Sequence, residues 1–194
     1  MCDVCGLPLS SGGLCNRCAQ ARPAYKALRS WAVFEEPVRS ALHRMKYRRD
    51  RSLGEALAAQ MMPFVSGLQW PFEAIVPIPL GKKRLQERGY NQVAMLALPL
   101  ARLLKVDYLP DALARIRETR SQVGLMVAQR LENMRGAFRA SPTIRGCSLL
   151  IIDDVSTTGA TLSSAADALY RGGAAEVYAV TVARALPHHG LSIV

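Results

Sequence analysis

The sequence predicts an α/β fold in which helices flank a mainly parallel sheet, preceded by a small N-terminal metal-binding segment. Two apolar runs, at 149–152 and 176–184, are typical of parallel strands that are buried on both faces. The first run is followed by apolar residues at helical spacing: Leu162, Ala165, Ala166 and Leu169. Four cysteines near the N-terminus form two Cys-x-x-Cys pairs, a spacing typical of structural zinc sites.

Length and composition indicate one domain of ordinary size with a small appendage. The chain has 194 residues, of which 50% are hydrophobic, which is enough to bury a core. It has no apolar run long enough to span a membrane and no signal-peptide pattern. We therefore expect a protein without an integral membrane segment, in the reducing cytoplasm, where the cysteines do not form disulfides.

The first 22 residues are predicted to form a zinc ribbon whose ligands are Cys2, Cys5, Cys15 and Cys18. Each pair of thiolates can turn around one tetrahedral Zn²⁺, and the two pairs together complete a four-sulfur shell. Because a segment of this length cannot build a hydrophobic core, metal binding would supply its folding energy. A shell filled by four thiolates leaves no place for a catalytic water, so this zinc would be structural. A redox dithiol pair or unligated thiols are the alternatives.

Residues 23–68 are predicted to form a linker and a basic helical segment, with a strand at 28–34. One helix begins near Pro37, and a second runs from Leu53 to Val65. Six Lys and Arg fall between positions 39 and 51, which suits either a surface for phosphates and single strands or a solvated helix face. The candidates for nucleic-acid contacts are Arg44, Lys46, Tyr47, Arg48, Arg49 and Arg51, with Tyr47 placed to stack on a base.

A short strand at 74–80 and a helix ending near Leu104 enclose a predicted loop that is rich in cations. This loop suits a pyrophosphate group, although a solvated basic loop is the alternative; its cations are Lys82, Lys83, Arg84 and Arg88. Residues 111–139 have weak periodicity and are predicted to be a long excursion that acts as a lid over a phosphate ester. The lid candidates are Arg117, Thr119, Gln122 and Arg130.

The apolar run at 149–152 leads into two carboxylates, Asp153 and Asp154, and then into a turn of small residues before a helix. A strand, a small-residue turn and a helix bring backbone N–H groups together on a phosphate. The predicted 5′-phosphate loop is Val155, Ser156, Thr157, Thr158, Gly159, Ala160 and Thr161. The two carboxylates would repel a phosphate, so they fit the hydroxyls of a diol or a Mg²⁺ ion. An ordinary turn with an aspartate N-cap is the alternative.

A phosphate beside a diol describes ribose 5-phosphate, and this run closely resembles the signature of type I phosphoribosyltransferases, which bind phosphoribosyl pyrophosphate (PRPP). Further motifs narrow the resemblance: the double Cys-x-x-Cys, Arg88–Gly89–Tyr90–Asn91–Gln92 and Thr181–Val182–Ala183–Arg184. With these motifs, nearly the whole chain resembles the ComF family of competence proteins. The resemblance implies a type I phosphoribosyltransferase fold, here over 69–194, with about five strands. Tyr90 stands where a phenylalanine is more usual in the family.

The resemblance also implies a role in natural transformation, in handling incoming single-stranded DNA in the cytoplasm near the inner face of the membrane, with other competence proteins as candidate partners. The net charge of +10, with its excess before residue 147, favours an anionic partner. Two hypotheses stay open. The first is a phosphoribosyltransferase that uses PRPP with Mg²⁺ on an unidentified nucleobase or amine acceptor, in nucleotide salvage. The second is a binding module without turnover, whose pocket recognises PRPP or a DNA terminal phosphate and whose basic face, with the zinc ribbon, binds single-stranded DNA or a competence partner. A regulatory protein that senses PRPP is a third reading, less favoured because the sequence shows no DNA-reading helix pair.

Overall fold

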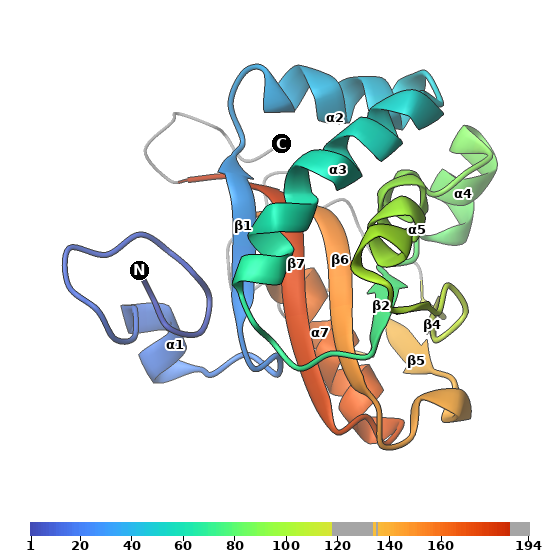
Figure 1. The fold of residues 1–194 in the computed structure, drawn as a ribbon. Helices are drawn as coiled ribbons and strands as arrows, with labels where there is room; N and C mark the ends of the chain where they lie inside the picture. The colour runs from blue at the N-terminus through green and yellow to red at the C-terminus, as the bar shows by residue number, and fades with distance from the viewer. Residues whose placement is uncertain (118–133, 135, 187–194) are drawn as a thin grey trace.

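The fold is that of an α/β protein with a five-stranded, fully parallel sheet, which confirms the predicted class (Figure 1). The structure is a computed structural model that describes residues 1–117, 134 and 136–186. The strand order is β1-β7-β6-β2-β3. The strands are β1 (Leu28–Val33), β2 (Ala74–Pro77), β3 (Asp107–Tyr108), β6 (Ser148–Ser156) and β7 (Glu176–Arg184).

Helices cover both faces of this sheet, and each face has its own core. The helices are α1 (Asn16–Gln20), α2 (Val38–Tyr47), α3 (Arg51–Gly67), α4 (Lys82–Arg88), α5 (Gln92–Leu104), the short 3₁₀ helix η1 (Pro142–Ile144) and α7 (Ala160–Arg171). Residues of α2, α3 and α5 pack on the face that carries Leu150 and Ile152 of β6. Residues of α7 and the N-terminal cysteines pack on the face that carries Leu149 and Ile151. Because both faces are covered, residues 149–152 of β6 are apolar without alternation.

The central strands β6 and β7 were predicted from their long apolar runs, and β1 matches the strand predicted at 28–34 within the segment assigned to a linker and basic helices. β1 pairs with β7, from Leu28 opposite Ala179 to Val33 opposite Arg184. The sheet therefore contains strands from both sides of the domain boundary that we predicted at residue 69. That boundary stays a prediction.

The prediction of a loop around the cations at 82–88 was wrong, because these residues form α4. Gly81 precedes the helix in an extended conformation, and Gly89 ends it in the left-handed region with φ 72°. The residues between them are mostly good helix formers, which explains why a continuous turn of helix forms there.

The two ends of the excursion predicted at 111–139 form strands that pair with each other. Strand β4 (Leu113–Arg115) pairs antiparallel with β5 (Phe138–Ala140) in a second, two-stranded sheet. Most of the segment between these strands lies outside the described residues. Within the described ranges, no helix combines the length and the hydropathy that a membrane span requires.

Candidate functional site

The predicted strand, turn and helix are present at the carboxyl end of β6. The strand ends at Ser156, and α7 begins at Ala160 after Gly159, whose φ of 77° lies in the left-handed region. The side chain of Thr158 accepts a hydrogen bond from the amide of Ala160 at 3.3 Å, which fixes the turn. The seven predicted loop residues therefore surround the positive end of a 12-residue helix. Ser156 is buried, while the side chains of Thr157, Thr158 and Thr161 are half-buried.

The two carboxylates beside this loop have different surroundings. Asp154 Oδ2 lies 3.0 Å from the ammonium of Lys46 and accepts a hydrogen bond from the Gln92 side-chain amide at 3.0 Å. Its other oxygen, Oδ1, accepts the Val155 amide at 2.7 Å. Asp153 Oδ1 accepts the Asp154 amide at 2.8 Å, and the two carboxyl groups also contact each other. Asp154 is therefore held in place, and Asp153 keeps acceptor capacity for a ligand.

The ionisation of the two carboxyl groups differs for the same reason. Burial raises the pKa of Asp153 to about 8, and the adjacent charge of Asp154 acts in the same direction. Burial would also raise the pKa of Asp154, but the Lys46 ammonium and the Gln92 amide outweigh burial and hold it below its ordinary value. Without ligand, Asp153 therefore keeps its proton to a higher pH than an ordinary carboxyl group, whereas Asp154 loses its proton more readily.

Gln92 is a site residue that reasoning about individual side chains did not identify, although it belongs to the quoted Arg-Gly-Tyr-Asn-Gln run. Its side chain is 3% exposed at the start of α5, and its Oε1 accepts a hydrogen bond from Arg88 at 2.8 Å. Arg88, Gln92, Asp154 and Lys46 thus form one chain of polar contacts. Asn91 caps α5 and also donates to the Ile78 carbonyl at 3.0 Å, which anchors the start of the helix to the end of β2.

Lys46 was predicted as a nucleic-acid contact, yet the structure places it in the carboxylate site. Tyr90 holds α2 in the position that allows this, because its hydroxyl donates to the Met45 carbonyl at 2.7 Å. The same hydroxyl accepts the amide of Arg49 at 2.9 Å. A phenylalanine at position 90 could make neither hydrogen bond, so the tyrosine joins α2 to the start of α5.

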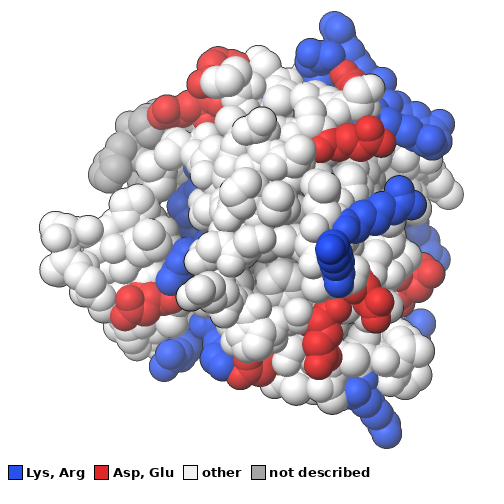
Figure 2. All heavy atoms as spheres, in the orientation of Figure 1, with Lys and Arg blue, Asp and Glu red and all other residues white. Residues whose placement is uncertain are grey.

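The remaining nucleic-acid candidates lie at the surface around the end of α2 and the start of α3. Tyr47, Arg48, Arg49 and Arg51 are exposed, while Arg44 pairs with Asp50 at 2.6 Å. Of the pyrophosphate candidates on α4, Lys82, Lys83 and Arg84 are exposed and Arg88 is half-buried. Lys and Arg side chains gather at the upper right in Figure 2, where Figure 1 shows the end of α2 and α4. Arg117 follows β4, whereas Thr119, Gln122 and Arg130 lie outside the described residues.

The four N-terminal cysteines come together as predicted. The sulfur atoms of Cys2, Cys5, Cys15 and Cys18 all lie within 4.8 Å of one another, and all four residues are buried. The Cys15 amide points to the sulfur of Cys2 at 3.4 Å, a contact that favours a thiolate. Four converging sulfurs are the donor set of a closed structural zinc site, so this cluster could hold a zinc ion.

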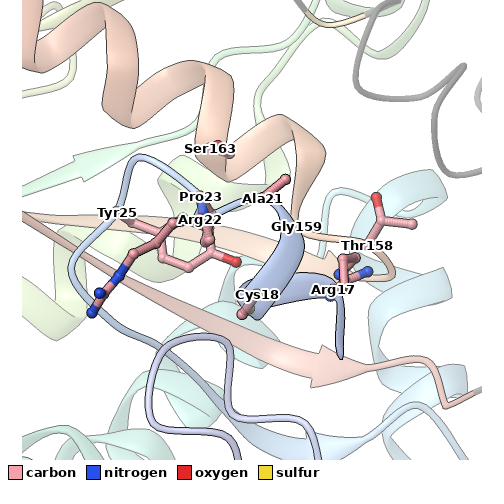
Figure 3. A pocket seen from close by; sticks show the side chains of 9 residues that line it. All are labelled: Arg17, Cys18, Ala21, Arg22, Pro23, Tyr25, Thr158, Gly159 and Ser163. Atoms are coloured by element: carbon pink, nitrogen blue, oxygen red, sulfur yellow. The ribbon is translucent and has the colours of Figure 1, made fainter. Parts of the chain in front are cut away.

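The cysteine cluster packs against the sheet and against the predicted phosphate loop. Arg184, buried at the end of β7, donates to the Cys5 carbonyl, and the Leu28 amide donates to the Val4 carbonyl at 2.7 Å. A pocket of about 90 Å³ lies where the ribbon meets the loop (Figure 3). It is lined by Arg17, Cys18, Ala21, Arg22, Pro23, Tyr25, Thr158, Gly159 and Ser163. In Figure 3 the guanidinium of Arg22 points away from Thr158 and Gly159.

Comparisons with known proteins agree with this architecture. Residues 93–189 match a family model described as the phosphoribosyl transferase domain. The "DNA utilization protein YhgH" of Escherichia coli K12 is 35% identical over 96% of this chain and 85% of that protein. "Competence protein F" of Haemophilus influenzae is 30% identical over 95% and 84% of the two chains. "Competence protein ComFC" of Bacillus subtilis is 30% identical over 95% and 78%.

Proposed function

Because the chain belongs to the ComF family, we propose that it binds PRPP with Mg²⁺ beside Asp153 and Asp154 and acts in the handling of incoming single-stranded DNA. The proposed binding of PRPP rests on one observation, the unequal carboxylate pair next to the predicted phosphate loop. The proposed role in handling single-stranded DNA is supported by the names of the relatives, which refer to competence and to DNA utilization.

The carboxylate pair suits a ligand with two hydroxyls and a divalent cation. Asp154 is oriented by Lys46 and Gln92, and Asp153 keeps an oxygen that can accept a hydroxyl. Carboxylate oxygens are also the donors that Mg²⁺ prefers, so the pair fits this ion when both groups are ionised. The Lys46 ammonium neutralises Asp154 when no cation is present, and a bound Mg²⁺ would compete with it for the same oxygen.

The turn between β6 and α7 supplies the complementary site for the 5′-phosphate. The first amides of α7 have no partner within the helix, and the helix dipole favours an anion at this end. The half-buried Thr157, Thr158 and Thr161 add hydroxyls without filling the site. The cations of α4 are candidates for the pyrophosphate, with Arg88 the one that already contacts the carboxylate site through Gln92.

Calorimetry with PRPP, in the presence and absence of Mg²⁺, tests the proposed pocket. We predict that the double variant Asp153→Asn with Asp154→Asn folds normally but shows no measurable PRPP binding, because both acceptors of the diol and the cation are lost. The matched control is Asp167→Asn on α7, an exposed carboxylate that pairs with Arg171, and it should bind PRPP like the wild type.

Undiminished PRPP binding by the folded double variant would overturn the assignment of the pocket. Failure of the wild-type protein to bind PRPP with Mg²⁺ would overturn the proposed ligand itself. A second arm measures the release of pyrophosphate with added nucleophiles, because release would show that the protein also transfers the phosphoribosyl group. Oligonucleotide binding is measured in parallel at two salt concentrations, since contacts to phosphates weaken steeply with salt.

A further inference from the structure

An aromatic side chain is presented to solvent at the end of α2, next to the candidate ligand site. Tyr47 is 67% exposed, the highest fraction among the exposed large hydrophobic residues in the described part of the chain. The His43 ring lies one helical turn earlier, with its centroid 4.6 Å from that of Tyr47 and the planes tilted by 44°. The Arg88 guanidinium lies over the Tyr47 ring at 5.6 Å from its centroid. These three side chains form what we call the Tyr47 platform.

The charges around the Tyr47 platform are mainly positive. Arg48 and Arg49 follow Tyr47 directly and are exposed, and the guanidinium of Arg49 lies over the Tyr90 ring at 5.6 Å. The exposed cations of α4 add to the same side of the molecule, where Figure 2 shows Lys and Arg gathered. An aromatic ring surrounded by cations suits a single-stranded nucleic acid, because its bases can stack on the ring while its phosphates contact the cations. This composition favours an unpaired base of a single strand over a lipid surface, which would use the charges but not the ring.

Arg88 belongs to the Tyr47 platform and also to the polar chain that leads to the carboxylates. Its Nη1 donates to Gln92 Oε1 at 2.8 Å, and the Gln92 amide donates to Asp154 at 3.0 Å. Lys46, which pairs with Asp154, is the residue before Tyr47 on the same helix. One guanidinium therefore lies between the ring and the ligand site. A pyrophosphate group that pairs with this guanidinium would compete with the Tyr47 ring for it.

We propose that the Tyr47 platform stacks an unpaired nucleobase of single-stranded nucleic acid, and that Arg88 couples this binding to the occupation of the carboxylate site. A pyrophosphate-bearing ligand draws Arg88 from the ring and opens the face of Tyr47 for the base. A base that occupies this face in turn leaves Arg88 available to the ligand. The two ligands therefore bind with positive cooperativity, which by linkage is the same factor in both directions. The coupling rests on the proposed PRPP site, and the stacking rests on the proposed handling of single-stranded DNA, for which it names a contact residue.

The stacking is tested with a fluorescent oligothymidylate in the full-length protein without PRPP. Tyr47→Ala should weaken binding by about 5- to 150-fold, the range for the loss of one stacked base, while Tyr47→Phe, which keeps the ring, should bind like the wild type. An abasic strand of the same length offers phosphates without bases, so Tyr47→Ala should leave its weaker binding unchanged. Equal binding of oligothymidylate by the wild type and Tyr47→Ala would overturn the stacking. An equal loss for both strands would also overturn it, because it would show a general effect on charge or folding.

The coupling is tested by repeating the oligothymidylate titration with saturating PRPP and Mg²⁺. We expect the wild type to bind the strand about fivefold more tightly or better, the lower range of allosteric coupling. Arg88→Lys keeps the charge but cannot contact the ring and the Gln92 amide with one planar group, so this gain should be lost. If PRPP binds and the strand affinity is unchanged or falls, the coupling is overturned while the proposed function stands. If calorimetry shows no PRPP binding, the proposed function and the coupling both fail, and the stacking is judged on the strand alone.

Discussion

At the scale of single residues, two adjacent aspartates differ because, among the described residues, Asp154 forms an ion pair with Lys46 and Asp153 does not. The Lys46 ammonium and the Gln92 amide keep Asp154 ionised, and burial raises the pKa of Asp153 to about 8. A carboxyl group with a raised pKa binds its proton more tightly in the folded than in the unfolded state. Its contribution to stability is therefore present at low pH and is lost as the pH rises from about 4 toward 8.

We predict that Asp153→Asn melts at a higher temperature than the wild type at pH 8 but not at pH 4, with no Mg²⁺ or ligand present. The neutral amide avoids the cost of ionising a buried carboxyl group next to Asp154. Each kcal/mol gained should raise the melting temperature by about 2–4 °C in a chain of this size, which circular dichroism can follow. Asp167→Asn, at an exposed position, should show no such dependence on pH. A shift of the same size at both pH values would contradict the assigned pKa.

The sequence identified the two aspartates but not the residues that make them different. Asp153 and Asp154 stand out because two charges follow an apolar strand. Lys46 is one of several cations in a basic helix, and only the packing of α2 against the start of α5 turns this one inward. Gln92 is a neutral residue in an apolar helix, and its burial beneath Asp154 depends on contacts 62 positions apart in the chain.

At the scale of elements, α3 and α5 approach closely because α3 has a glycine at their crossing. A Cβ atom on Gly54 would lie 2.7 Å from the Met95 carbonyl oxygen, which is shorter than a real contact allows. We predict that Gly54→Ala lowers the free energy of unfolding by about 1–3 kcal/mol, the usual cost of overpacking, measured by urea titration.

The matched control for this prediction lies at the end of the same helix. A Cβ atom on Gly67 would meet nothing within 4 Å, so Gly67→Ala should be neutral or slightly stabilising. Equal effects of the two substitutions would show that backbone propensity, not the crossing of α3 and α5, decides the outcome.

The long apolar strands and the amphipathic helices could be predicted, because local periodicity records burial on one or both faces. Strand β1 was expected, but its place in the sheet was not, because its partner β7 lies about 150 positions away in the chain. Helix α4 was missed because its seven residues present no buried face that would give a pattern.

At the scale of the whole molecule, the zinc ribbon is in contact with the candidate ligand site. The Tyr25 hydroxyl lies so close to Gly159 that a Cβ atom there would be 2.7 Å from it, and α1 lines the pocket beside Thr158. The N-terminal segment is therefore placed to support the predicted phosphate loop. The convergence of its four cysteines was predictable from their spacing, but its contact with the loop was not, because no local pattern encodes that contact.

We predict that the wild type carries one zinc per chain by elemental analysis and that Cys2→Ser with Cys5→Ser releases it. Loss of the metal unfolds the ribbon and should weaken PRPP binding about fivefold or more without abolishing it, since the carboxylates remain. Cys147→Ser, which changes a cysteine outside the cluster, should retain the zinc and full affinity. If the wild-type protein contains no zinc, the assignment of a zinc ribbon is wrong. If the zinc-free variant keeps the full affinity for PRPP, the predicted phosphate loop needs no support from the ribbon.

The pairing of β1 with β7 has a consequence for the synthesis of the protein. β1 is synthesised well before its neighbour in the sheet, because Ala179, the partner of Leu28, follows 151 residues later. At translation rates of roughly 5–20 residues per second, β1 waits about 8–30 s before its neighbour exists. Throughout this time the nascent chain exposes an unpaired strand edge, which other chains can join. The completed edge of the sheet therefore forms last, and premature termination before β7 should give an aggregation-prone product rather than a smaller folded protein.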